Sequence, residues 1–191
     1  EIDMDGTPVR LFDTWIHYLP DMRLVPTDKS EEEILAWDDA GTRDEEIRKI
    51  LGALKPMIAE SDSIPIVMGG DFNSHSHLEE YLRPVTYIPE TKSIDTLFKE
   101  MQAANFKDSF REINPDPVKN IGTTWLTDAD SLETVNRQDR IDFIYYQGKT
   151  IQAVESQCYD NILGETFSFK GEDFFYASDH GFVLTTFTIR K

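Results

Sequence analysis

Residues 64–77 read IPIVMGGDFNSHSH, a short apolar run followed at once by a carboxylate, a carboxamide and two imidazoles. The run 64–68 is apolar at every position, which predicts a strand buried on both faces of a sheet. Gly, Asp and Asn after a strand are also the ordinary residues of a tight turn. The polar residues are therefore functional only if other segments bring matching groups to the same place.

The composition sets limits on fold and partners. The chain of 191 residues, 39% hydrophobic and 12% aromatic, can bury a sizeable core, and we predict one domain over residues 1–191. No run approaches the roughly eighteen consecutive apolar residues of a membrane-spanning helix. The lone Cys158 excludes an internal disulfide and leaves the cellular compartment open. The formal charge of −17 disfavours unaided binding to nucleic acid, although a bound divalent cation can reverse the sign locally.

Periodicity in the first half predicts strands and helices in alternation. Residues 9–18 alternate as a strand does, and residues 20–41, rich in Asp and Glu, are expected to form a surface excursion. A match to the capping box begins at Thr42, with Glu45 three residues later, and predicts a helix start. The expected buried face of that helix consists of Ile47, Ile50, Leu51, Leu54 and Ile58.

The second half changes to β-branched and aromatic runs separated by Gly, Asp and Asn. A helix is predicted over residues 93–104, with Asn105 in the left-handed position that ends a helix. Strands are predicted after it, over residues 123–127, 140–146, 150–159 and 182–189. Together the two halves predict an α/β protein whose second half is mostly strand.

Polar residues suited to chemistry lie at or near the ends of these strands: His17, Asp71 with Asn73, Asp142, and Asp179 with His180. Strand ends and the loops after them are where a rigid α/β scaffold presents reactive groups, so we expect these clusters to meet at one rim. The combination suits hydrolysis of a phosphate ester. That reaction needs an activated water, donors to the phosphate oxygens and a hard cation.

Each residue type has a chemical role that fits it. Asp71 is the candidate base, and Asn73 and the histidines are candidate donors. Asp142 is the candidate partner for His180, because a neighbouring carboxylate raises the pKa of an imidazole and keeps it protonated. Asp179 fits a ligand for Mg²⁺ or Mn²⁺, which prefer carboxylate oxygen.

Three motifs follow His17 in the sequence in an order that resembles the endonuclease/exonuclease/phosphatase superfamily, which has the DNase-I-like fold. The motifs are Gly70-Asp-Phe-Asn73, Arg140-Ile-Asp-Phe-Ile144 and Ser178-Asp-His180. The resemblance covers nearly the whole chain from Val9 onward. It implies a four-layer α/β/β/α sandwich, two sheets face to face with helices outside, and divalent-metal-dependent hydrolysis of phosphodiesters or phosphomonoesters.

The resemblance also implies a role for each matching residue: Asp71 as the water-activating carboxylate, Asn73 and His17 as phosphate contacts, Asp142 as the group that orients His180, and Asp179 as a metal ligand. The family's strand-borne Asn and its metal-binding Glu have no counterpart ahead of His17. We therefore expect the chain to be the C-terminal part of the full domain, lacking its first strands. Alone, it should bind metal weakly and turn over poorly.

Residues 73–78, 106–111, 114–117 and 122–125 resemble, more loosely, a bacterial and fungal branch of the superfamily that is often secreted. This looser resemblance implies a secreted or periplasmic location. His77 lies in one of these segments and is assigned to the rim of the substrate site. Trp125 is assigned either to core packing or to a wall of the substrate pocket.

Two other functions stay open. The missing Asn and Glu favour a catalytically silent binding domain of the same fold. His75 and His77 suggest a zinc hydrolase of another fold, although two imidazoles form an incomplete zinc site. For the phosphoesterase, the charge of −17 and the lack of a Lys/Arg-rich run favour a small phosphate ester or a lipid head group over long nucleic acid.

Overall fold

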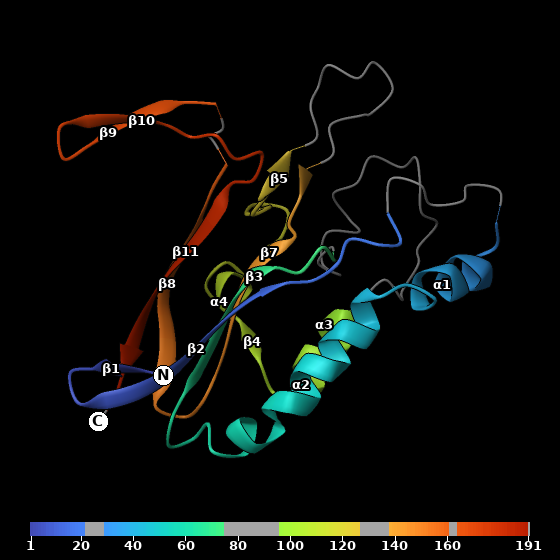
Figure 1. Cartoon of the computed structure of the whole chain (residues 1–191), viewed down its shortest axis with the longest axis horizontal. Coiled ribbons are helices and arrows are strands. Elements are labelled where there is room, and N and C mark those ends of the chain that lie inside the picture. Colours follow the sequence, from blue (N-terminus) through green and yellow to red (C-terminus); the bar gives the residue numbers. More distant parts are fainter. Residues whose placement is uncertain (22–28, 75–95, 127–137, 161–163, 191) are drawn as a thin grey trace.

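A computed structural model describes residues 1–21, 29–74, 96–126, 138–160 and 164–190. Its largest sheet is mixed, with strand order β1-β2-β3-β7-β4 (Figure 1). These strands are β1 (Ile2–Met4), β2 (Thr7–Trp15), β3 (Ile66–Asp71), β7 (Asp142–Gln147) and β4 (Lys107–Asp108). The pair β2 and β3 is parallel, and the other neighbouring pairs are antiparallel. The central position of β3 places its last residue between two other strands.

A second, smaller sheet pairs β8 (Ile151–Tyr159) with β11 (Phe182–Ile189) in antiparallel register. Two further antiparallel pairs are the hairpin of β9 (Thr166–Phe169) with β10 (Glu172–Phe175), and β5 (Trp125–Leu126) with β6 (Gln138–Asp139). The hairpin projects from the end of the smaller sheet, whereas β5 lies beside β6 (Figure 1).

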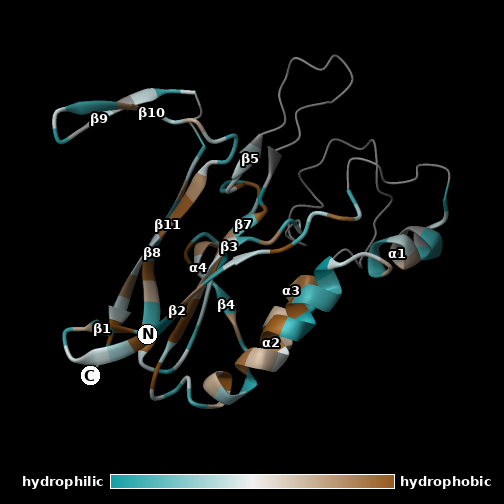
Figure 2. Cartoon of the chain, viewed as in Figure 1, coloured by the Kyte–Doolittle hydropathy of each residue, from teal (hydrophilic) through white to brown (hydrophobic). Residues whose placement is uncertain are grey.

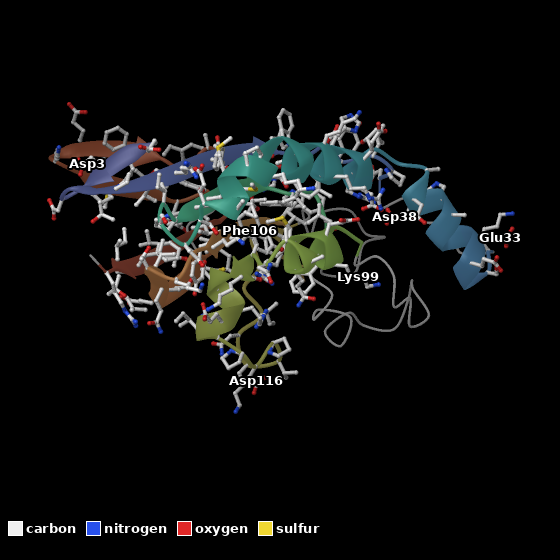
Figure 3. The ribbon with its side chains drawn as sticks, turned by 90° about the horizontal axis from the view of Figure 1, so that it is seen from below. Asp3, Glu33, Asp38, Lys99, Phe106 and Asp116 are labelled. Atoms are coloured by element: carbon white, nitrogen blue, oxygen red, sulfur yellow. The ribbon has the colours of Figure 1, made fainter. Side chains whose placement is uncertain are left out.

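The helices are α1 (Glu31–Asp39), α2 (Arg43–Ala59), α3 (Thr96–Ala103) and α4 (Ser109–Ile113) among the described residues. Side chains of α2 and α3 form one core with a face of the main sheet; its buried members include Ile47, Leu54, Met101, Met68 and Tyr145. Figure 2 shows hydrophobic residues, in brown, on α2, α3 and strands of the main sheet. Phe106, labelled in Figure 3, is also buried in this core. Residue alternation makes this arrangement possible, because successive side chains of a strand point to opposite faces.

The opposite face of the main sheet packs on the smaller sheet. Tyr146 of β7 and Ile151 and Ala153 of β8 are buried there, with Val67 and Phe187 packed against them. The described chain thus forms a layer of helices, the main sheet and the smaller sheet. No helix in the described ranges is both long enough and apolar enough to span a membrane.

Several predicted elements are confirmed. The apolar face of α2 is buried as expected, with Ile47 and Leu54 in the core and Ile50, Leu51 and Ile58 packed against it. The strand predicted over 182–189 matches β11, and β7 and β8 begin within two residues of their predicted starts. Asn105 has the expected positive φ of 63°. Residues 93–95 of the predicted second helix, and residue 127, lie outside the described residues.

Other features of the first half differ from the predictions. The segment 20–41, expected as a surface excursion, contains α1, a helix that was not predicted, which begins with a capping box at Ser30 and whose described side chains are mostly exposed. The predicted capping box at Thr42 is absent, because Thr42 has helical φ and ψ and makes no side-chain cap. The strand predicted over 9–18 is β2, which ends at Trp15, so His17 lies two residues beyond it.

The structure also adds the hairpin partner β1. Its turn contains Asp5 and Gly6 at φ 54° and 84°, and an Asp-Gly pair is a strong hairpin signal.

Candidate active site

The end of β3 is held between two neighbouring strands. In the sheet register, Asp71 lies opposite Trp15 of β2 on one side and Asp142 of β7 on the other. The predicted strand was too short at this end, because β3 continues through both glycines to Asp71. Gly70 has φ 147°, and a Cβ there would lie 1.8 Å from the Thr14 carbonyl oxygen. Gly70 therefore lets β3 pass close to β2 and continue to Asp71 at the end of the strand.

Asn73 holds the Asp71 carboxylate by two hydrogen bonds. The Asn73 backbone N–H donates to Asp71 Oδ1 at 2.8 Å, and Nδ2 donates to Oδ2 at 2.9 Å. Nδ2 also donates to the Ile16 carbonyl at 2.9 Å, so both carboxamide hydrogens are engaged. Asn73 is thereby placed as an orienting partner of Asp71. Its expected role as a phosphate donor stays a prediction.

Asp142 and His180 form the predicted pair. His180 Nδ1 lies 2.9 Å from Asp142 Oδ2, and both side chains are about three quarters buried or more, with 25% and 20% of their side-chain surface exposed. Because the carboxylate only accepts, Nδ1 carries the hydrogen in this bond. This hydrogen bond is the largest factor that raises the pKa of His180, and the charges of Asp142, Asp71 and Asp179 add to it, while burial opposes it.

The pKa of Asp71 is also raised, chiefly by burial. The charge of Asp142 raises it further, whereas the hydrogen bond from Asn73 and the charge of His180 lower it. Ligand atoms of Asp71, Asp142 and His180 all lie within 4.8 Å of one another. The structure thus brings a carboxylate with a raised pKa next to an imidazole that is readily protonated.

His17 is fixed beside this cluster through its backbone. The Ile16 N–H donates to the Asp71 carbonyl at 2.9 Å, and the His17 N–H donates to Glu46 Oε2 at 2.8 Å. His17 Nδ1 accepts from the Leu19 N–H at 3.2 Å and lies 3.2 Å from Thr42 Oγ1. Because Nδ1 is an acceptor, the ring hydrogen of neutral His17 is on Nε2. Nε2 is therefore the ring atom with which His17 can donate to a ligand.

Arg43, at the start of α2, connects the His17 loop with the loop that follows β3. Its Nη1 donates to the carbonyls of Tyr18 at 3.1 Å, Pro20 at 2.9 Å and Asn73 at 3.3 Å. Nη2 pairs with the carboxylate of Asp38 in α1. One buried guanidinium therefore sets the position of two loops that carry predicted site residues.

Residues 7–180 match the sequence model of the Endonuclease/Exonuclease/phosphatase family. The chain belongs to this family. An uncharacterized protein of Caenorhabditis elegans is 32% identical over 134 residues, which are 63% of this chain and 40% of that protein. The family assignment predicted from the ordered motifs is confirmed, and members of this family are phosphoric ester hydrolases.

Solved structures of family members share the fold. A crystal structure of D. rerio TDP2 complexed with single-strand DNA product has a TM-score of 0.50 and 17% identity, and covers 97% of this chain and 58% of that one. Truncated TDP2 of Caenorhabditis elegans has a TM-score of 0.50 and 16% identity, and covers 98% and 57%. The DNase-I-like α/β sandwich is thus confirmed, and the chain spans less than two thirds of the length of each of these three proteins.

The clustered donors suit the divalent cations that the family generally uses. Asp71 and Asp142 offer carboxylate oxygen, which Mg²⁺ and Mn²⁺ prefer, whereas His180 donates its Nδ1 hydrogen to Asp142. The donor set therefore fits such an ion. Asp179, the ligand expected from the sequence, is exposed and is not one of the three clustered residues, although its charge raises the pKa of His180.

The remaining predicted site residues are Trp125, His75 and His77. Trp125 forms an isolated β-bridge with His180, and their ring centroids are 6.3 Å apart, which suits a wall of the site. His75 and His77 lie outside the described residues, so the rim assignment and the zinc alternative stay predictions.

The sequence reading missed Arg43 and Glu46. They bind backbone groups of a loop more than 20 residues away, for which no local pattern exists.

Proposed function

We propose that this family member hydrolyses phosphate esters, with Asp71 as the water-activating base and His180 as a hydrogen-bond donor to the phosphate. The observation that carries the proposal is the Asp142–His180 hydrogen bond beside Asp71, with the ligand atoms of all three residues within 4.8 Å. An imidazole with a raised pKa and a carboxylate with a raised pKa meet the needs of donor and base in one step.

In the proposed reaction, Asp71 removes a proton from a water that attacks phosphorus, and the bond from phosphorus to the leaving oxygen breaks. Burial supports this role, because a raised pKa makes Asp71 a stronger base near neutral pH. Asn73 keeps the carboxylate oriented. The N–H groups of His180 and His17 stabilise the charge on the phosphate oxygens as it develops.

We include Mg²⁺ or Mn²⁺ in the proposal, held by Asp179 together with carboxylate oxygen of the cluster. When bound, such an ion supplies positive charge to the phosphate and the leaving oxygen. The two clustered carboxylates support this part of the proposal, as does the exposed carboxylate of Asp179, whose charge acts on the adjacent His180.

The proposed substrate is a small phosphate ester or a lipid head group. A chain with a formal charge of −17 repels a long polyanion through its summed field, whereas a small ester presents few charges. The single-strand DNA product bound to D. rerio TDP2 makes a short oligonucleotide end the natural comparison substrate.

The test measures hydrolysis of a chromogenic phosphodiester and a chromogenic phosphomonoester by the full-length protein. We expect activity with Mg²⁺ or Mn²⁺ and a loss of roughly 10²-fold or more in Asp71→Ala and in His180→Ala, because each removes a group used in the chemical step. Asp142→Asn should cost less than His180→Ala, since the imidazole remains. Asp173→Ala, on the projecting β9–β10 hairpin, is the matched control and should retain full activity.

Each part of the proposal has its own contrary result. Full turnover in excess chelator would remove the metal from the proposal. Near-wild-type rates in both Asp71→Ala and His180→Ala would show that the assigned roles are wrong. Full activity of Asp142→Asn together with low activity of His180→Ala would show that His180 acts without its hydrogen bond to Asp142. Absence of turnover on every ester would favour the catalytically silent binding domain.

A further inference from the structure

Thr124 is bonded to the backbone beside both members of the Asp142–His180 pair and is fully buried, with 0% of its surface exposed. Its Oγ1 accepts two backbone hydrogen bonds, from the N–H groups of Ile141 and Asp142, each at 3.1 Å. A hydroxyl oxygen has two lone pairs, so one side chain satisfies both donors. The start of β7, which carries Asp142, is therefore bonded directly to this threonine.

The backbone of the same residue holds the other half of the pair. The Thr124 carbonyl accepts from the Gly181 N–H at 2.6 Å, directly after His180. The next residue, Trp125, forms an antiparallel bridge with His180 itself. Thr124 thus contacts the flanking backbone of two residues that are 38 positions apart in the sequence.

The two N–H groups at the start of β7 need this acceptor. Ile141 precedes the first residue of β7, and its N–H and that of Asp142 both point to the one Thr124 oxygen instead of to opposite sides as in a regular strand. Ile141 already uses its carbonyl for the Phe72 N–H at 2.8 Å, beyond the end of β3. Replacement of the hydroxyl by a methyl group would leave two buried donors without this acceptor and free the Asp142 backbone to shift.

We infer that Thr124 is a positioning residue for the proposed hydrolysis, which acts by fixing Asp142 against His180. The expected effect on catalysis rests on the proposed function, whereas the expected effect on the position of Asp142 rests on geometry alone. Small displacements of a positioned group lower the rate of the chemical step more than they weaken substrate binding.

The experiment compares Thr124→Val, Thr124→Ser and Thr123→Val in the full-length protein. Valine has the shape of threonine without its acceptor, and serine keeps the acceptor without the methyl group. Thr123 is the matched control, because it is also buried, with 3% of its surface exposed, and its side chain makes no hydrogen bond within the described residues. Two quantities are measured: kcat and KM on a chromogenic phosphate ester, and the NMR resonance of the His180 Nδ1 hydrogen.

We expect Thr124→Val to lower kcat roughly 10- to 100-fold with little change in KM, and to shift the His180 resonance. Thr124→Ser should restore both quantities, and Thr123→Val should change neither. A wild-type kcat in Thr124→Val, or a serine variant as impaired as the valine variant, would overturn the inference.

If the wild-type protein hydrolyses no phosphate ester, the proposed function fails, and the catalytic consequence of Thr124 fails with it. The structural claim is then decided by the resonance. An unchanged His180 signal in Thr124→Val would overturn that claim, whereas a shift restored by serine would support it.

Discussion

Gly70 shows how a single residue determines the position of the candidate base. A Cβ at this position would meet the backbone of β2, with the Thr14 carbonyl oxygen at 1.8 Å and its carbon at 2.8 Å. Backbone atoms cannot move aside as the tip of a side chain can. The φ of 147° is also one that L residues with side chains rarely adopt. Asp71 follows directly, so any shift at Gly70 displaces the carboxylate.

We expect Gly70→Ala to lower the free energy of unfolding by on the order of 3 kcal/mol, because strain and overlap with backbone occur together. Gly52 in the middle of α2 is the matched control, since a Cβ there would meet no atom within 4 Å. Gly52→Ala should raise stability by about 0.5–1 kcal/mol through higher helix propensity. Urea unfolding followed by circular dichroism measures both. Equal stability of Gly70→Ala and the wild type would show that β2 and β3 can separate without cost.

The first turn of α2 organises the loops around the site. Arg43 joins this turn to α1 through Asp38 and to three backbone carbonyls. The ion pair is buried, with 5% and 9% of the two side chains exposed. Removal of one partner from a buried pair leaves the other charge uncompensated, which is far more harmful than loss of an exposed pair.

We expect Arg43→Met to lower the free energy of unfolding by roughly 3–5 kcal/mol, with part recovered when Asp38→Asn is added. Arg48→Met is the same change a little further along α2. Its pair with Glu100 is 52% and 34% exposed, so the loss should be at most about 1 kcal/mol. Chemical denaturation of the single and double variants measures these differences. Similar losses in Arg43→Met and Arg48→Met would show that the buried Arg43–Asp38 pair stabilises the fold no more than the exposed Arg48–Glu100 pair does.

Across the whole molecule, the excess of acidic residues lowers the stability of the folded state. The chain has 36 acidic against 19 basic residues, and Asp44 is buried near Asp38 and Asp39. Burial first, and then the charge of Asp38, raises the pKa of Asp44 to about 6 from an ordinary value of 3.8. Between these two pH values the folded state binds more protons than the unfolded chain, so stability falls as pH rises.

We expect Asp44→Asn to raise the free energy of unfolding at pH 7.5 by up to about 3 kcal/mol, and to have little effect below pH 4. Loss of a carboxylate from the first turn of a helix offsets only about 0.5 kcal/mol of that gain.

Asp116 is the contrasting control, because backbone N–H groups lower its pKa, and Asp116→Asn should give no gain at pH 7.5. Thermal unfolding from below pH 4 up to pH 8 measures both variants. A destabilised Asp44→Asn protein at pH 7.5 would show that the ionised carboxylate is stabilised in the fold.

Local patterns predicted those elements whose signals are short-range. The apolar residues from Ile47 to Ile58 are spaced with the period of a helix, and this spacing predicted α2. Runs of β-branched residues predicted β7, β8 and β11. The same rules failed around Thr42, where the hydroxyl lies against His17 and the Leu19 carbonyl instead of capping the helix. A tertiary partner there competes with the local motif, and the sequence offers no sign of it.

The sequence by itself determined the chemical types at the strand ends, the family and the α/β class, because each depends on residue identity and periods of a few positions. Only the tertiary structure decided which groups meet. Asp142 and His180 are 38 residues apart, and Thr124 reaches Asp142 across 18, so their contacts depend on strand order and register. The raised pKa values of Asp71 and His180 follow from burial and neighbouring charge, which exist only after the sheets have packed.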